Sequence, residues 1–521
     1  MKKIFTTLFA GLMISVQVMA VSVLDVCGQY EGDLLLGSED KYPESQVYLL
    51  PGVTDNTLTF VLPDFKFSGV SLGSIVLPNI AISENGQFTI EETTLYLADP
   101  LYLRATINIL SSYEVEGVTY TSLATGNKAG IVLEIAEPQT LPEPIIVCFA
   151  GEAVRSNNYM LPNGGFEGAW TNNEPAGWHS FGTATGPLVG FVKGNTAQFS
   201  QSADVRPGSK GRNSAVLSSK TIFGVNANGN CTNGQIYAGS MTANDPAKNY
   251  NFSDPDSAFN TPFQGHPDSI VLWAKYIPGD RNTADDANQA RLSAVITTNA
   301  RYQDPELNND SIKHADFRMG AATLNYSATA DLGWQRLAVP FVYTELVETE
   351  DPAYILATFT TNKLPGGGNA TQSAPDSVFI DDVELVYNNR ISLLARGEET
   401  LEFNGEAYQI NDTYCDSCGE FTSLKTGIST QAFYAFDAIH KCVFVYVIAD
   451  DYAQTGKYNI YRVDFTDSDT EGTSIDPKEP DTQGIEDVYS GQTRFEKVLI
   501  NGQLFIRSND AWYNASGMRV K

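Results

Sequence analysis

The sequence predicts an all-β protein made of several domains. After the first 20 residues, the apolar residues show almost no helical periodicity. Short runs rich in Val, Ile, Thr, Tyr and Phe instead alternate with Gly, Asn, Asp and Pro, which is the pattern of strands joined by turns. A chain of 521 residues is too long for one domain, so three or four β-domains are expected. The clearest strand-like runs stand at 58–67, 74–82, 93–98, 269–277, 377–387 and 441–449.

Residues 1–20 (MKKIFTTLFAGLMISVQVMA) read as a secretory signal peptide, because Lys2 and Lys3 precede an apolar run that ends at the small residue Ala20. No other apolar run reaches the roughly 20 residues that cross a bilayer. We expect a mature protein that is secreted or displayed at the cell surface, with association to the outer membrane left open. Lipid attachment at Cys27 is an alternative that the residues before it, Leu-Asp-Val, disfavour.

The net charge of −29 argues against nucleic acid and anionic membrane as partners. It suits a neutral partner such as a glycan, or a cation such as calcium. Solubility alone explains the acidity equally well.

Six cysteines in an exported chain are able to pair. Cys27 and Cys148 bracket the first domain, so a disulfide between them would tie its first strand to its last. Cys415 and Cys418 have CxxC spacing without a second CxxC or a nearby histidine, which favours a local disulfide or free thiols over zinc.

The first domain is expected at 27–147, where short, closely spaced strands suit an up-and-down barrel. YEGDLLLG (30–37), LTFVLPDFKF (58–67) and GIVLEI (130–135) resemble the calycin-like barrels of Bacteroidetes secreted proteins. The resemblance implies either a barrel around a small apolar ligand or a filled scaffold.

The second domain is expected at 155–390. It opens with NGGFEGAW (163–170) and closes with SVFIDDVELVY (377–387). The order of its segments resembles the proposed carbohydrate-metabolism domain of Bacteroidetes surface proteins. Its two ends resemble those of jelly-roll carbohydrate-binding modules, so a jelly-roll β-sandwich is implied.

Three further segments follow. Residues 391–466 have the strand rhythm of a small immunoglobulin-like β-sandwich, and 467–484 form an acidic linker. Residues 485–521 resemble the C-terminal sorting segment of Bacteroidetes exported proteins, with a hairpin turn at Asn501-Gly502. That resemblance implies secretion or surface attachment, and a plain terminal hairpin is the alternative.

A calcium site is expected where the ends of the second domain meet. In a jelly roll the first and last strands are neighbours, so Glu167 is expected to approach Asp381 and Asp382. Three carboxylates repel one another unless a cation lies among them, and calcium prefers such oxygen ligands. Alternatively, Glu167 accepts N–H groups of its own turn while the two aspartates face water.

Sugar binding requires aromatic faces with polar groups beside them. Trp170 is followed by polar residues and is the preferred platform, and Tyr250 and Phe252 lie in an aromatic segment (249–263) expected to be a loop. Trp178 and Trp273 are expected in the core.

The expected function is non-catalytic binding of a polysaccharide or host glycan. The alternatives are a protein-binding adhesin with surface partner proteins, and a glycoside hydrolase. No sequence motif of a hydrolase, a metalloprotease or a nucleotide-binding enzyme is present. The presence of two suitable carboxylates among 62 acidic residues is uninformative. The sequence leaves the oligomeric state open.

Overall fold

The structure is a computed structural model in which residues between 21 and 514 are described. The signal peptide, the acidic linker, Cys415 and Cys418 lie outside the described residues. The gaps within the described range are 38–39, 55, 68–69, 72, 98–102, 137–142, 156–157, 194–197, 223, 243–244, 281–288, 308–313, 364–373, 390–392, 397–399, 404–405, 410–427, 438–441, 465–494, 501–502 and 509–510.

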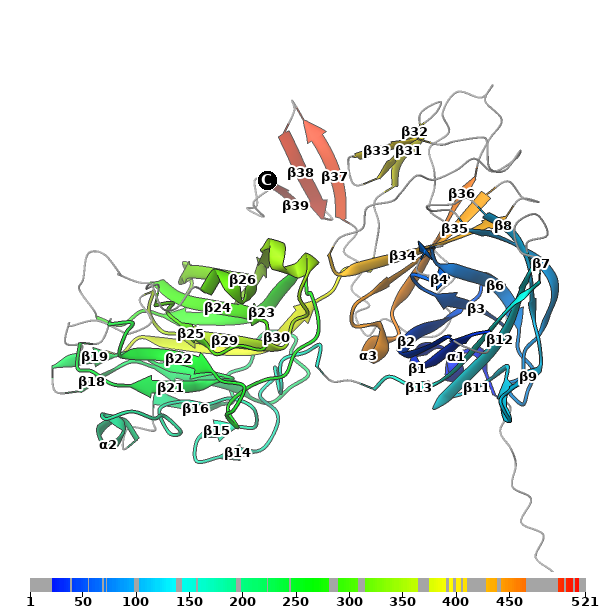
Figure 1. Ribbon diagram of the computed structural model, residues 1–521. Coiled ribbons are helices and arrows are strands. Elements are labelled where there is room, and N and C mark those ends of the chain that lie inside the picture. Colours follow the sequence, from blue (N-terminus) through cyan, green and yellow to red (C-terminus); the bar gives the residue numbers. More distant parts are fainter. Residues whose placement is uncertain are drawn as a thin grey trace, which may run out of the picture. The chain divides into compact units, whose positions relative to one another are not determined.

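The all-β prediction is confirmed, and the N-terminal part forms a nearly closed barrel-like sheet (Figure 1). Its strands follow the order β6-β3-β2-β1-β13-β12-β8-β7, all antiparallel, with β11 added beside β12. The strands are β1 (Gly28–Leu36), β2 (Asp40–Pro51), β3 (Thr57–Leu62), β6 (Ile75–Ala81), β7 (Ile90–Leu97), β8 (Leu103–Ile109), β11 (Leu123–Thr125), β12 (Lys128–Ala136) and β13 (Ile145–Ala153). Short elements accompany them: α1 (Val23–Val26), β4 (Lys66–Phe67), β5 (Val70–Ser71), β9 (Ser112–Val115) and β10 (Val118–Thr121).

Apolar side chains line the interior of the barrel. Alternate residues of its strands point inward, as the pleat requires, and they form one buried cluster that includes Tyr30, Phe60, Ile107, Ile131 and Phe149. Burial alone does not separate a filled scaffold from a barrel around a small apolar ligand, so both interpretations stay predictions.

The expected disulfide between Cys27 and Cys148 is wrong, since both thiols are free. The first and last strands do pair, but their register sets Leu35 opposite Cys148. Cys27 lies eight residues before Leu35 along the same strand direction. At about 3.3 Å per residue that separation is about 26 Å, far beyond disulfide reach. Cys148 instead packs with Val132 in a small outer cluster.

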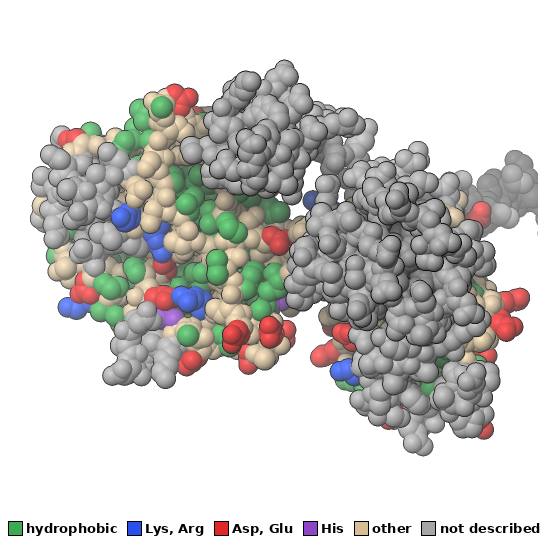
Figure 2. All heavy atoms as spheres, turned by 90° about the horizontal axis from the view of Figure 1, so that it is seen from above, with side chains coloured by type: hydrophobic (Ala, Val, Ile, Leu, Met, Phe, Trp, Pro, Cys, Tyr) green, Lys and Arg blue, Asp and Glu red, His purple; other side chains and the backbone are tan. Residues whose placement is uncertain are grey.

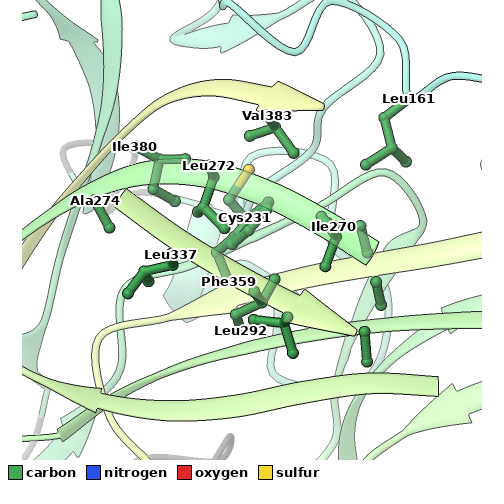
Figure 3. Packing of buried hydrophobic residues seen from close by; sticks show 14 of the residues in the cluster. Leu161, Cys231, Ile270, Leu272, Ala274, Leu292, Leu337, Phe359, Ile380 and Val383 are labelled. Atoms are coloured by element: carbon green, nitrogen blue, oxygen red, sulfur yellow. The ribbon is translucent and has the colours of Figure 1, made fainter. Parts of the chain in front are cut away.

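The central part is a sandwich of two antiparallel five-stranded sheets, β16-β17-β30-β23-β27 and β20-β29-β24-β26-β28. Figure 3 shows their buried side chains interdigitating, among them Leu272, Phe359 and Ile380. The strands are β16 (Phe199–Ser202), β17 (Ser214–Ser218), β20 (Asn230–Thr232), β23 (Ser269–Ile277), β24 (Gln289–Thr297), β26 (Arg318–Ser327), β27 (Gln335–Pro340), β28 (Val342–Tyr343), β29 (Tyr354–Thr360) and β30 (Ser377–Val386).

A third, small sheet covers the outer face of the second one. It has the order β21-β22-β25, and Tyr302 of β25 packs on Val295 and Leu356 of the sheet beneath. Around it lie short elements that shape the surface described below. The strands of this small sheet are β21 (Gln235–Ala238), β22 (Asn249–Ser253) and β25 (Tyr302–Asp304). The other short elements of the central part are β14 (Trp170–Thr171), β15 (Glu174–Pro175), α2 (Val189–Val192), β18 (Lys220–Ile222), β19 (Val225–Ala227), η2 (His314–Asp316) and η3 (Glu345–Glu348).

Residues 430–464 form a three-stranded sheet that packs against the barrel wall. We term it the pad: β34 (Thr430–Asp437), β35 (Cys442–Ala449), α3 (Tyr452–Thr455) and β36 (Tyr458–Asp464). Tyr446 of the pad is fully buried in one cluster with Tyr48 and Leu50 of β2, and the Tyr452 hydroxyl donates to the Leu49 carbonyl at 3.1 Å. A separate sheet contains β31 (Leu393–Arg396), β32 (Thr400–Phe403) and β33 (Glu406–Gln409). The immunoglobulin-like sandwich over 391–466 stays a prediction.

The C-terminal residues form a compact unit of their own, Glu479–Lys521. It contains the meander β37 (Phe495–Ile500), β38 (Gln503–Ser508) and β39 (Ala511–Asn514). Ile500 pairs with Gln503, the register of a two-residue hairpin loop, and β39 extends the predicted hairpin by a third strand.

Within the part of the chain that the structure describes, no helix is long and apolar enough to cross a membrane. Acidic side chains are spread over the visible described surface rather than gathered in one patch (Figure 2).

Candidate functional site

The two ends of the central sandwich meet, as the sequence predicts. The Val383 amide of β30 donates to the Gly164 carbonyl at 2.9 Å. The contact is so close that a Cβ on Gly164 would lie 2.0 Å from the Val383 oxygen, so only glycine fits there. A β-bulge in β30 opposite β23 accompanies this contact, with Asp382 at a φ of 47°.

The carboxylates at this junction are satisfied by protein groups. Glu167 Oε1 accepts the backbone N–H groups of Arg212 and Asn213, each at 2.7 Å, and Oε2 accepts the Asn213 side-chain amide at 2.9 Å. Asp382 forms an ion pair with the Arg206 guanidinium. No group of three metal-ligating side chains occurs among the described residues. This arrangement does not fit a calcium ion held by Glu167, Asp381 and Asp382, and calcium stays a prediction for titration to test.

Asp381 is buried beside this ion pair. Its Oδ2 accepts the Arg206 backbone N–H at 3.1 Å, and its Oδ1 has no partner in the described part of the chain. Desolvation raises the pKa of Asp381 to about 6, against the lowering effect of the Arg206 N–H. The Arg206 guanidinium lies over the Trp273 ring, 5.4 Å from its centroid. These groups cover the outer face of the sheet rather than open a site.

Replacing Asp381 with asparagine should therefore raise the melting temperature at pH 7.5, by the equivalent of about 1 to 3 kcal/mol. The folded-state pKa is raised above the usual 3.8, so ionisation costs stability once the pH exceeds the unfolded value. The gain should shrink as the pH falls from 6 towards 4, where the wild-type carboxyl is neutral. Thermal melts across this range test it, and a gain independent of pH would contradict it. Asp382→Asn, the control, removes an ion pair and should not stabilise.

The tryptophans take partly different places from those expected. Trp178 is fully buried, as predicted, between Phe166 and Phe359. Trp273 was expected in the core, but it is only partly buried on the outer face of β23. The sheet alternation explains the error, because Leu272 and Ala274 on either side take the core positions.

Trp170, the expected sugar platform, is half-buried. Its indole N–H donates to the Phe166 carbonyl at 3.0 Å, and its ring packs on Phe199 with centroids 5.5 Å apart. One ring face and the polar edge are thus used inside the domain, so Trp170 is a poor platform.

A groove opens beside β21 and β22, between α2 and the β18–β19 hairpin. Most of its walls are apolar, and Phe191 of α2 and Met241 leave 53% and 41% of their surface exposed. We term it the asparagine groove. It is lined by Phe181, Leu188, Phe191, Val192, Ile222, Val225, Ala227, Asn228, Asn230, Ile236, Tyr237, Ala238, Ser240, Met241, Asn249, Tyr250 and Asn251.

Asparagines from two segments supply the polar part of this groove. Asn249 and Asn251 lie on one face of β22, because side chains alternate along a strand. Asn230 and Asn251 are only 5% and 1% exposed, and the Oδ1 atom of each has no partner among the described residues. Asn226, two residues before Asn228, is fully buried. Neither its side-chain nitrogen nor its side-chain oxygen has a partner within the described structure. A buried polar group without a partner costs about 1–3 kcal/mol, which marks this cluster as a place where a ligand is expected.

Of the aromatic residues that the sequence analysis singled out, Tyr250 alone lines the groove. Residues 249–253 form strand β22, so the expectation of a loop beginning at 249 is wrong. Tyr250 stacks on Tyr237 across the strand pair, with ring centroids 4.9 Å apart. Phe252 is buried beneath Arg301, 4.8 Å from its centroid, and does not line the groove.

The asparagines were missed, although the sequence holds a signal for them. NYN (249–251) places asparagine at every second position, and in a strand this brings the amides to one face. VNANGN (225–230) has the same spacing, although it spans the end of β19 and the start of β20. Alternating asparagine in an otherwise apolar β-segment is unfavourable for folding alone, and this cost is the clue.

No protein-family model matches the chain, and no curated protein matches it. Among solved structures, the chain is similar to a candidate glycoside hydrolase from Bacteroides thetaiotaomicron. The two are 14% identical, and the match covers 60% of this chain and 93% of the other, with a TM-score of 0.32. A likeness this distant does not bear on function.

Proposed function

We propose that this is an exported, non-catalytic carbohydrate-binding protein, and that its central sandwich binds a glycan in the asparagine groove. The observation that carries the proposal is an apolar groove lined by asparagines, two of which, Asn230 and Asn251, each have a buried amide oxygen without a partner among the described residues. Sugar hydroxyls donate the hydrogen bonds that these oxygens lack.

The apolar walls of the groove match the apolar face of a sugar ring. Pyranose rings carry an apolar C–H face, which packs on aromatic and aliphatic side chains. Phe181 and Phe191 offer such surfaces, and Tyr250 also lines the groove. A concave, mostly apolar site with a few polar groups is the usual form of a small-ligand site.

The remaining features of the chain are consistent with this role. The signal-peptide-like residues 1–20 favour secretion or cell-surface display, where polysaccharides and host glycans are the available ligands. The net charge of −29 disfavours nucleic acid. The barrel would serve display or contact with surface partner proteins.

Replacing Asn251 with leucine tests the proposal. The substitution removes an unpaired buried amide, so the melting temperature should stay unchanged or rise. Retardation of the mature protein in native gels that contain a bound polysaccharide should be lost, a drop in affinity of about tenfold or more. Asn325→Leu, at an exposed position of β26, is the matched control and should keep wild-type retardation.

A gel series with calcium and with EDTA adds the test for the ion. Retardation that persists in EDTA would separate glycan binding from calcium. Uniform mobility of the wild-type protein across a broad polysaccharide panel would overturn the proposal and favour the protein-binding adhesin.

A further inference from the structure

The described residues that line the asparagine groove include no charged side chain. Each of them is apolar, aromatic, serine or asparagine, in a chain whose net charge is −29. A charged ligand would lose its hydration there without gaining a counter-ion from the described lining residues. The groove therefore selects a neutral ligand, which excludes uronic acids, sialic acids, sulfated sugars and free amino sugars.

The unpaired polar atoms at the groove are hydrogen-bond acceptors, so they require a ligand that donates hydrogen bonds. Two lining residues, Asn230 and Asn251, each have an Oδ1 acceptor without a partner among the described residues. Both oxygens are covered in this conformation, so a ligand reaches them only when the amide side chain turns into the groove. A ligand group that only donates, such as an amide N–H, matches this need as well as a hydroxyl does.

The apolar walls suit a ligand that carries an apolar group in addition to the face of its sugar ring. Phe191 and Met241 present exposed apolar surface, and Leu188, Val192 and Ile222 continue it. A hexose alone carries hydroxyls around its rim, which would be desolvated against these side chains. A methyl group next to an N–H donor matches both the apolar walls and the asparagine oxygens.

We propose that the groove recognises a neutral 2-acetamido sugar, with the acetamido N–H donating to an asparagine oxygen and the acetamido methyl lying against the apolar wall. This inference rests on the proposed function, since it names the sugar class taken by the same site. The burial of one methyl group and one added hydrogen bond predict about tenfold or greater preference over the parent hexose.

The experiment is an NMR or calorimetric titration of the mature protein with N-acetylglucosamine, N-acetylgalactosamine, glucose, galactose, glucosamine, glucuronic acid and N-acetylneuraminic acid. One or both neutral acetamido sugars should bind at least about tenfold more tightly than their parent hexoses. The charged sugars, including the acetamido-bearing N-acetylneuraminic acid, should bind more weakly than the neutral acetamido sugars.

Two variants place the effect within the groove. Met241→Gln, which lies at an exposed position, should reduce the preference for the acetamido sugar while leaving binding of the parent hexose nearly unchanged. Asn251→Leu should weaken both, and Asn325→Leu neither. Equal binding of hexose and acetamido sugar would overturn this inference and leave the proposed function standing. Absence of binding by every sugar and every polysaccharide would overturn both.

Discussion

Replacing Arg291 with methionine should destabilise the central sandwich by about 3–5 kcal/mol. Arg291 of β24 donates through its two terminal nitrogens to both carboxylate oxygens of Asp304, at 2.7 and 2.6 Å. Asp304 is only 3% exposed, so removal of the guanidinium leaves a buried charge without a partner. A thermal or urea melt followed by tryptophan fluorescence measures the loss, since Trp170, Trp178, Trp273 and Trp334 all lie in the sandwich.

The same substitution should weaken ligand binding without touching the groove. Asp304 of β25 pairs in register with Asn251 of β22, so the ion pair anchors the sheet that presents the groove amides. The double variant Arg291→Met with Asp304→Asn removes the stranded charge and should recover much of the stability. A single-variant loss below about 1 kcal/mol would show that water reaches the carboxylate and would contradict the burial argument.

Deleting the pad should destabilise the barrel by about 6 kcal/mol or more. Tyr48, Leu50, Val61 and Val76 of the barrel wall are buried in one cluster with the pad, and each would become exposed at a cost of about 1.5–3 kcal/mol. A chain that ends at 390 therefore should bind a hydrophobic dye and exchange the backbone amides of β2 and β3 faster. Hydrogen exchange read by mass spectrometry is suited to this, because the barrel contains no tryptophan.

A chain that ends at 465 is the matched control for this deletion. It lacks the linker and the C-terminal unit but keeps the pad, so exchange in β2 and β3 should match that of the full chain. If the two truncated chains exchanged alike, the pad would not be the cover of the barrel wall.

The sequence analysis succeeded where the signal is local. The runs at 269–277 and 377–387 coincide with β23 and β30 almost residue for residue, because β-branched and aromatic residues in alternation fit only a pleated, half-buried strand. Tyr250, which lines the groove, was predicted as a sugar-binding residue because an aromatic side chain among polar residues can be recognised in the sequence without knowledge of its tertiary contacts. The asparagine signal was equally local and was overlooked.

The errors share a non-local cause. Cys27 directly precedes β1 and Cys148 lies on its partner β13, yet the register separates them by about 26 Å. Glu167 and Asp382 do lie at one junction, but the segment around Arg206 and Arg212 supplies their partners, and nothing near either carboxylate in the sequence shows this.

The sequence by itself determined the all-β fold class, the position of the clearest strands along the chain and the acidic character of the protein, because these follow from composition and from a period of two along the chain. The tertiary structure decided which polar groups are paired. Glu167, Asp382 and Asp304 find donors from distant segments, whereas the Oδ1 atoms of Asn230 and Asn251 have none among the described residues. Pairing depends on strand register and sheet stacking across the chain, and the candidate site lies where that pairing is incomplete.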